Sequence, residues 1–213
     1  MGKVTLSFDN GPEPTVTGRV LDILKAFDVR TTFFVIGAKL VDPARYSLAQ
    51  RAGREGHWIG NHSLTHKMPF GETREEGAAS IEIGEAQEAI GILAHPDRLF
   101  RPFGGGGRLD KILLNREALN YLIAGHYTCV LWNCVPHDWD QPEQWVDNAL
   151  SECDQRPWSL VVLHDLPTGA MVHLERFLDR LRVRHEIVQE FPPDCVPIRR
   201  GMVTTPIDAY VAD

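Results

Sequence analysis

Two histidines, His62 and His66, are separated by three residues, a spacing that lets one turn of chain present two imidazoles to a single divalent ion. Nine histidines in 213 residues produce such a pair by chance fairly often, so the spacing alone is a weak signal. It gains weight because the pair directly follows a segment predicted to be a strand. Asn61 and Ser63 stand beside it as candidate hydrogen-bonding partners of the imidazoles.

Four further side chains suited to acid–base chemistry follow or end short apolar segments. They are Asp9, Arg101, Asp138 and His164. A carboxylate accepts a proton, an imidazole accepts or donates one, and an arginine pairs with a carboxylate. An acid, two spaced imidazoles, an arginine, a second acid and a third imidazole therefore follow successive segments of the same type.

Each of these residues also has a structural interpretation. Asp9 precedes Gly-Pro and is typical of a turn. Arg101 fits a surface position after an edge strand, and His164 and Trp139 fit a buried core. All of these interpretations must hold together for a functional site to be absent, and their coincidence at successive strand ends argues against that.

The segments that position these residues alternate between two types. Short, β-branched apolar runs predict strands at residues 4–8, 31–36, 57–60, 99–103, 127–132 and 160–164. Longer amphipathic stretches predict helices at residues 16–27, from 43 to glycine 53 or 56, and at 75–93, 109–124, 142–153 and 172–190.

Strands that alternate with helices predict an α/β domain with a mainly parallel sheet. Several strand segments are apolar on both faces, as buried parallel strands require. The pattern does not distinguish an open sheet from a closed barrel, but in both architectures sites form at the carboxyl ends of the strands. The tail from Pro192 predicts a last strand and a loose end.

Length and composition narrow the function classes. The chain fits a single domain, 1–213, and its formal net charge of −7 argues against binding to nucleic acid or an anionic membrane. No apolar segment is long enough to span a membrane and no signal peptide is visible, which predicts a cytoplasmic protein. Four cysteines without metal-finger spacing are predicted to be reduced and structural.

Five short motifs in order resemble those of the polysaccharide deacetylase family, the carbohydrate esterases that include chitin and peptidoglycan deacetylases. The five are Ser-Phe-Asp-Asn-Gly-Pro at 7–12, His-Ser-Leu-Thr-His at 62–66, Arg-Pro-Phe-Gly at 101–104, Asp-Trp at 138–139 and Val-Leu-His at 162–164. They span residues 7 to 164, most of the chain. Five in order form a specific signal, although each alone is weak.

The resemblance implies a distorted (β/α) barrel of the TIM type with fewer than eight full units. It implies that His62, His66 and Asn10 hold a divalent metal, zinc first, with cobalt, nickel or manganese as alternatives. It further implies that Asp9 is the general base, paired with Arg101, and that His164 is the general acid, oriented by Asp138. Trp139 and Leu163 would form apolar walls around the acetyl methyl group.

Two of the five motifs depart from the family pattern. Phe103 and Gly104 stand where proline and tyrosine usually follow Arg-Pro, and the Gly104 N–H can still serve as an oxyanion donor. The four glycines at 104–107 predict a bare, flexible groove wall. Asn10 replaces a usual aspartate ligand, and a neutral amide binds a metal less tightly.

The resemblance implies hydrolysis of N-acetyl groups on an amino-sugar polymer or oligosaccharide, with release of acetate. An N-acetylated carbohydrate is then the one partner expected, with no protein partner implied. Two alternatives remain open: hydrolysis of a non-sugar amide on the same barrel, and a carbohydrate-binding pseudoenzyme that lost its metal through Asn10.

Overall fold

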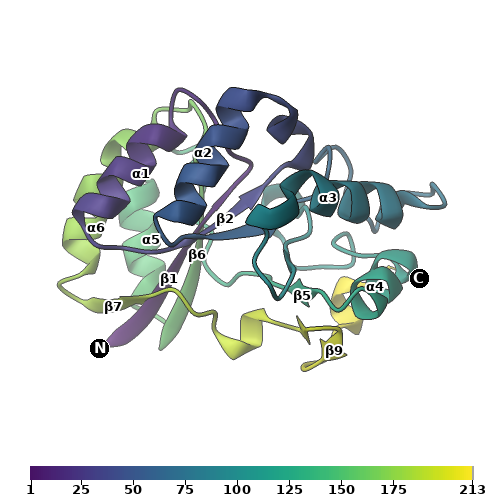
Figure 1. Ribbon diagram of the computed structural model, residues 1–213. Helices are drawn as coiled ribbons and strands as arrows, with labels where there is room; N and C mark the ends of the chain where they lie inside the picture. The colour runs from purple at the N-terminus through teal and green to yellow at the C-terminus, as the bar shows by residue number, and fades with distance from the viewer. Residues whose placement is uncertain (213) are drawn as a thin grey trace.

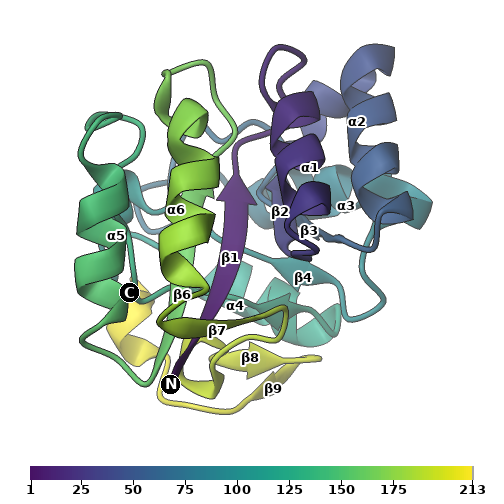
Figure 2. The same cartoon turned by 90° about the vertical axis from the view of Figure 1, so that its left-hand side faces the viewer.

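A computed structural model describes residues 1–212, which are organised around a nine-stranded sheet (Figures 1 and 2). Six strands run parallel in the order β6-β1-β2-β3-β4-β5. Their bounds are β1 (Gly2–Asp9), β2 (Thr32–Val35), β3 (Trp58–Asn61), β4 (Leu99–Phe100), β5 (Thr128–Cys129) and β6 (Trp158–His164).

Helices connect these strands and cover the outside of the sheet. They are α1 (Thr17–Ala26), α2 (Pro43–Arg54), α3 (Ala86–Ile90), α4 (Arg116–Ala124), α5 (Trp145–Cys153) and α6 (Leu174–Leu181). Figure 2 shows α5, α6, α1 and α2 standing side by side outside β1. The predicted α/β alternation is therefore confirmed, and all six predicted strand segments contain a strand.

The residues after β5 bring the curled sheet back against β6. Cys134 forms a parallel bridge with Val161, the Val162 N–H donates to the Cys134 carbonyl at 3.0 Å, and the Leu160 N–H donates to Asn133 Oδ1 at 2.7 Å. These bonds make the fold a distorted (β/α) barrel with fewer than eight units, as predicted. The distortion arises where β4 and β5 contribute only two residues each.

Strand alternation divides the side chains of β1 between two environments. Val4, Leu6 and Phe8 pack in the core cluster that also holds the apolar faces of α1, α5 and α6. Thr5, Ser7 and Asp9 lie on the opposite face, because successive strand residues point to opposite sides. The carboxyl end of β1 thus directs Asp9 away from the helices.

Several predicted element boundaries were wrong. The helix predicted at 172–190 ends at Leu181, and β7 (His185–Val188) follows it and pairs in parallel with the first half of β1. The helix predicted at 109–124 begins only at Arg116, where Asn115 caps it by accepting the Ala118 N–H. Residue 114 instead forms a bridge with residue 211, a tertiary contact that overrides local propensity.

Other differences are smaller. The strands predicted at 99–103 and 127–132 end at Phe100 and Cys129, and the helix predicted at 142–153 begins at Trp145. The helix predicted at 75–93 is divided into a π-helix (Ser80–Glu85), α3 and a 3₁₀ turn (Gly91–Leu93).

The C-terminal segment is a hairpin rather than one strand and a loose end. β8 (Ile198–Arg199) pairs antiparallel with both β5 and β9 (Met202–Val203), and the Ala212 N–H donates to the Leu114 carbonyl at 2.8 Å. This hairpin lies along the lower edge in Figure 1. It covers the edge of β5, which would otherwise expose unpaired backbone groups.

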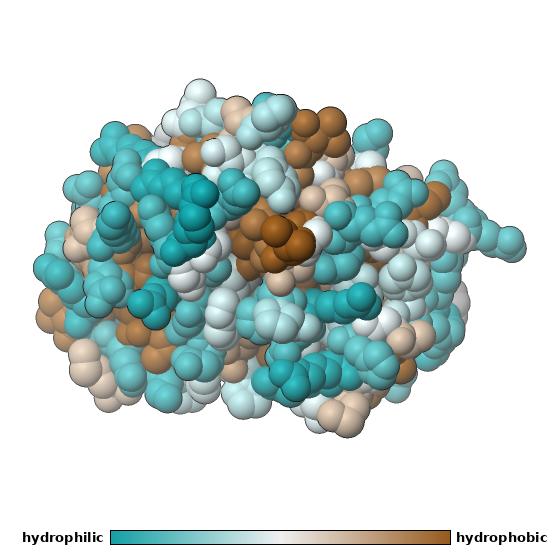
Figure 3. Space-filling model, in the orientation of Figure 1, coloured by the Kyte–Doolittle hydropathy of each residue, from teal (hydrophilic) through white to brown (hydrophobic). Residues whose placement is uncertain are grey.

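The four cysteines are free, buried thiols, as predicted. Over residues 1–212, no helix combines the length and apolar character needed to cross a membrane. Figure 3 shows a largely hydrophilic face with small hydrophobic patches.

Candidate functional site

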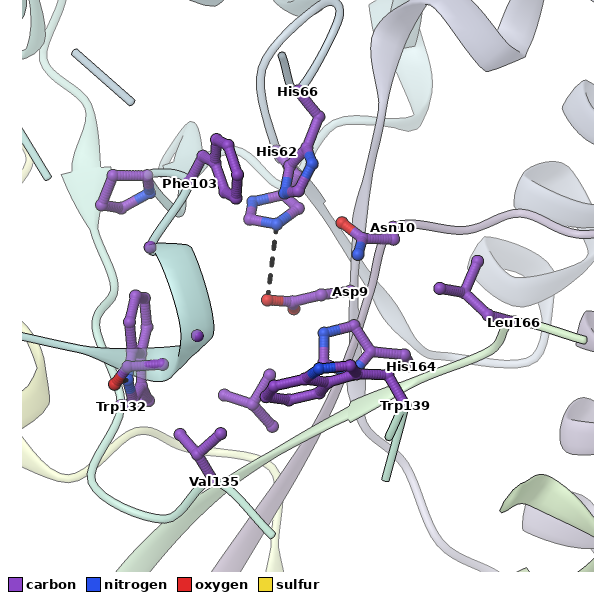
Figure 4. Close-up of a pocket in the computed structure, with 15 residues that line it drawn as sticks. Asp9, Asn10, His62, His66, Phe103, Trp132, Val135, Trp139, His164 and Leu166 are labelled. Carbon is purple, nitrogen blue, oxygen red and sulfur yellow. Dashed lines mark hydrogen bonds and ion pairs between the residues drawn. The ribbon is translucent and has the colours of Figure 1, made fainter. Parts of the chain in front are cut away.

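A cavity of about 250 Å³ opens at the carboxyl ends of the parallel strands (Figure 4). Asp9 ends β1, His164 ends β6, and these two residues are register partners in the sheet. His62 directly follows β3, and its backbone N–H donates to the Val35 carbonyl at 2.9 Å. The cavity is therefore located where the strand–helix alternation predicted it.

Asp9 and Arg101 form a buried ion pair on one wall. Arg101 Nη1 lies 2.8 Å from Asp9 Oδ1 and donates to Ser7 Oγ at 2.6 Å. The remaining guanidinium nitrogens donate to the Val130 and Leu131 carbonyls at 3.2 Å, and the group stacks over Phe34 at 4.1 Å. Arg101 is 0% exposed, so its charge is balanced inside the protein by Asp9.

His62 is oriented by the backbone rather than by a neighbouring side chain. Its Nδ1 donates to the Arg101 carbonyl at 2.8 Å, which leaves Nε2 facing Asp9 Oδ2 at 3.6 Å. Burial lowers the pKa of His62 to about 3, so at neutral pH this contact joins a carboxylate to a neutral imidazole. Nε2 therefore carries a lone pair that is available to bind a metal ion.

His66 lies beside His62 with ring centroids 4.6 Å apart, and it also stacks on Phe103 at 4.0 Å. Burial, and then the proximity of His62, lower the pKa of His66 to about 3. Asn61 and Ser63, expected beside the imidazoles, instead brace the loop: Asn61 Oδ1 accepts the Ser63 N–H, and Ser63 Oγ accepts the His66 N–H.

The side-chain oxygen of Asn10 is a candidate metal ligand. Its Oδ1 atom is buried, with no hydrogen-bond partner anywhere in residues 1–212, and its side chain lines the same cavity as both histidines (Figure 4). An unpartnered buried amide oxygen is costly unless a ligand or water satisfies it. Two neutral imidazoles and this oxygen fit a divalent cation that accepts nitrogen and oxygen donors.

This set of candidate metal ligands contains no carboxylate. Within the described part of the chain, no three or more His, Cys, Asp and Glu side chains are grouped so that they could hold a metal. The third donor here is an amide, which brings no charge. We therefore expect the residues to fit a metal with reduced affinity.

His164 and Asp138 form a second pair on the opposite wall. Asp138 Oδ1 lies 2.8 Å from His164 Nδ1, and Asp138 Oδ2 accepts the His164 backbone N–H at 2.8 Å. Burial lowers the pKa of His164, but the hydrogen bond and charge of Asp138, with the charges of Asp9 and Asp165, outweigh burial and raise it. The protonated form is thereby favoured.

Substitution of Asp138 by asparagine should shift the pH dependence of activity. Without the carboxylate the pKa of His164 falls. As the pH rises, a reaction that needs protonated His164 therefore begins to slow at a lower pH than in the wild type. The descending alkaline limb of kcat/KM should therefore move toward acid in Asp138→Asn, as a pH–rate profile would measure. An unchanged limb in a folded variant would remove His164 from the proton-donating role.

Asp165, the residue after β6, holds the end of this strand against neighbouring segments. It is fully buried and accepts a hydrogen bond from the Thr17 hydroxyl, and burial raises its pKa to about 6. Its carboxyl group packs so closely on Gly11 that a Cβ there would lie 2.3 Å from both oxygens. This contact joins His164's strand to the turn that follows Asp9.

The apolar walls differ in part from expectation. Trp139 packs edge-on against His164 at 4.9 Å, and Phe103 and Gly104 line the cavity, but Leu163 does not. Strand alternation places Leu163 in the helix-facing core, and Val162 shares the inner face with His164. Gly106 and Gly107, from the predicted glycine wall, also line the cavity. The lining residues not identified from the sequence are Pro102, Trp132, Val135, Val162 and Leu166. The period of two could have identified Val162.

The glycine segment is closely packed at its two ends, Gly104 and Gly107. Gly105–Gly107 forms a 3₁₀ turn, and Trp132 Nε1 donates to the Gly107 carbonyl at 2.8 Å. A Cβ on Gly104 would lie 2.4 Å from the Trp132 ring. The expectation of a bare wall was therefore wrong at Gly104, where Trp132 fills the space of the missing side chain, whereas a Cβ on Gly106 would meet nothing within 4 Å.

Gly104→Ala should consequently displace Trp132 and distort the cavity. Overpacking of this kind costs roughly 1–3 kcal/mol in the free energy of unfolding. Chemical denaturation would measure the loss, and Gly53→Ala, where a Cβ meets nothing within 4 Å, is the matched control. Equal stability of the two variants would contradict the tight packing at Gly104.

A barrel that brings a carboxylate–arginine pair and a carboxylate–imidazole pair into one cavity is equipped for general acid–base hydrolysis. A family model described as polysaccharide deacetylase matches residues 2–123. The chain is 34% identical over 164 residues to a chitooligosaccharide deacetylase of Rhizobium leguminosarum bv. trifolii, covering 76% of this chain and 71% of that protein.

A peptidoglycan-N-acetylglucosamine deacetylase of Bacillus cereus is 30% identical over 166 residues, covering 76% of this chain and 72% of that protein. Among solved structures, a family 4 acetyl xylan esterase from Clostridium thermocellum in complex with a cobalt ion superposes with a TM-score of 0.72 at 24% identity, covering 88% and 87% of the two chains. The chain belongs to the polysaccharide deacetylase family and is a hydrolase of that family.

Proposed function

We propose that this protein removes N-acetyl groups from an amino-sugar polymer or oligosaccharide and releases acetate, with a divalent metal as cofactor. The observation that carries the proposal is the convergence of Asp9–Arg101 and Asp138–His164 on one cavity with His62 and His66. The relatives named as chitooligosaccharide and peptidoglycan deacetylases support a substrate of this class.

His62, His66 and Asn10 would hold the metal, and a bound divalent ion polarises an amide carbonyl and acidifies water. Zinc is the ion we expect, and the cobalt ion in the related esterase supports a divalent metal generally. The neutral state of both imidazoles, which follows from their lowered pKa values, leaves their lone pairs free.

The protein's own groups divide the proton transfers. Asp9 Oδ2, on the cavity side of the Arg101 pair, accepts the proton of the attacking water. Arg101 holds this carboxylate in place through Oδ1. His164, held by Asp138 through Nδ1, gives a proton to the departing nitrogen from Nε2. The Gly104 N–H is the candidate donor to the oxyanion.

The direct test is acetate release from chitooligosaccharides and from peptidoglycan fragments, each measured before and after chelation and after readdition of zinc or cobalt. Release that chelation abolishes and metal restores supports the proposal. Sugar binding without release would favour a binding pseudoenzyme. Release only from small non-sugar amides would favour the other hydrolase.

Asn10→Asp should raise metal affinity. The carboxylate adds a negative charge to two neutral imidazoles, so we expect the Kd for zinc to fall by at least about tenfold, equivalent to 1.4 kcal/mol. Isothermal titration would compare this variant with protein whose residue 10 is verified as asparagine by peptide mass. Asn148→Asp on α5, outside the cavity lining, is the control. Equal zinc affinities of Asn10→Asp and of the protein with asparagine at residue 10 would exclude residue 10 as a ligand.

A further inference from the structure

Asn10 carries the same type of chemical group that the proposed reaction cleaves. Its side chain ends in a primary amide, and an N-acetyl group is likewise an amide whose carbonyl carbon is attacked by water. Asn10 lines the cavity together with Asp9 and His164, and Figure 4 shows its amide on the side that holds Asp9, His62 and His66. The site therefore encloses an amide that belongs to the chain itself.

The surroundings of this amide leave its carbonyl oxygen unprotected. Among residues 1–212, Asn10 Oδ1 receives no hydrogen bond although it is buried. Burial without a donor raises the free energy of the amide in its present form. Conversion to a carboxylate would give a group that a bound cation stabilises more strongly.

We propose that Asn10 is a self-modification site, at which the protein hydrolyses its own side-chain amide and converts residue 10 to aspartate. The inference rests on the proposed roles of Asp9 and His164. Water oxygen bonds to Cγ while Asp9 takes a proton, and the Cγ–Nδ2 bond then breaks as His164 protonates the leaving nitrogen. One water is consumed, one ammonia is released, and no oxidation occurs.

A second route to the same loss of ammonia exists, because glycine follows Asn10. The next backbone nitrogen can attack Cγ to form a cyclic imide, most readily when a glycine leaves the nitrogen unhindered. That imide opens to a mixture of aspartate and isoaspartate, in which the backbone is rerouted through the side chain.

The structure favours direct hydrolysis because it fixes the Asn10–Gly11 peptide. The Asn10 carbonyl accepts from Lys39 Nζ at 2.7 Å, and the Gly11 carbonyl accepts the Ile36 N–H at 3.2 Å. Asp165 occupies the space against Gly11. We expect these contacts to resist the rotation of the peptide that cyclisation requires, whereas attack by water on Cγ requires no such rotation. The expected product is therefore aspartate without isoaspartate.

Peptide mass spectrometry tests the proposal without reference to enzyme activity. Freshly purified and incubated wild-type protein, with and without added zinc, is digested, and the residue-10 peptide is examined for the exchange of an amide NH₂ for a hydroxyl group. Isoaspartate is assayed separately. Asp9→Asn and His164→Ala are treated identically, and Asn148, whose amide donates to the Gln141 side chain, is the internal control.

We expect aspartate at residue 10 in the wild type, with Asn148 unchanged. In each variant, conversion should be slower by roughly 10²–10⁴-fold, the usual contribution of one proton-transfer group. Asparagine that persists at residue 10 of the wild type overturns the proposal. So does isoaspartate that forms equally fast in the wild type and in Asp9→Asn, because it identifies cyclisation.

Acetate release measured on the same samples separates this proposal from the proposed function. Deacetylation by protein that retains asparagine leaves the proposed function intact and removes the self-modification. Conversion of residue 10 without acetate release from any acetylated sugar supports the self-modification and contradicts the proposed function.

Discussion

His164→Ala should lower kcat by roughly 10²–10⁴-fold on an acetylated chitooligosaccharide, with a much smaller change in KM. The imidazole is held by Asp138 on Nδ1 and by its backbone N–H, so Nε2 is the nitrogen available to a departing amine. Since proton donation occurs in the transition state, its loss appears in kcat. The decrease corresponds to about 2.7–5.4 kcal/mol of transition-state stabilisation.

The control is His173→Ala, which removes an imidazole that bonds Glu143 away from the cavity lining. Steady-state kinetics on both variants, with unfolding curves to establish that each is folded, gives the comparison. If His164→Ala kept kcat within about tenfold of wild type, another group would have to protonate the leaving nitrogen.

Asp9→Asn should reduce turnover by a similar factor, roughly 10²–10⁴-fold, for a different reason. The amide can still accept the Arg101 hydrogen bond through its oxygen, so the local geometry can be kept, but it cannot take a proton from water. Arg101 also loses its buried counter-charge, which should lower the free energy of unfolding.

Kinetics and denaturation together separate these two effects. Asp22→Asn is the matched control, because Asp22 pairs with Arg51 at an exposed position and such pairs contribute roughly 0–1 kcal/mol. Metal titration of Asp9→Asn should give a Kd near that of wild-type protein whose residue 10 is verified as asparagine, since the proposed ligands are His62, His66 and Asn10. Full activity in folded Asp9→Asn would contradict its assignment as the base.

The sequence was informative where local chemistry and periodicity coincide. Strand positions, the site at the carboxyl ends and the grouping of Asp9, Arg101, Asp138 and His164 followed from apolar runs that end in polar residues. These features depend on which residues lie next to each other in the chain. The roles of the individual residues stay predictions.

Features that depend on contacts between distant segments were not predictable. β7 was assigned to a helix because the amphipathic pattern of α6 runs on, and pairing with β1 decides otherwise. The use of the Arg101 carbonyl to orient His62 leaves no trace in side-chain identity. Trp132 was missed because only the folded chain brings it against Gly104. Leu163 was misplaced although strand alternation alone would have corrected it.

The position of Arg101 bears on how an inactive descendant of this chain would look. Arg101 donates to β1 through Ser7 and Asp9 and to the segment after β5 through Val130 and Leu131, so it ties together the two sides of the barrel. Selection for a folded protein alone would preserve it, together with a carboxylate at position 9. Loss of catalysis during evolution should therefore be recorded first at His164 and the histidine pair, and the Asp9–Arg101 pair should persist in lineages that no longer deacetylate anything.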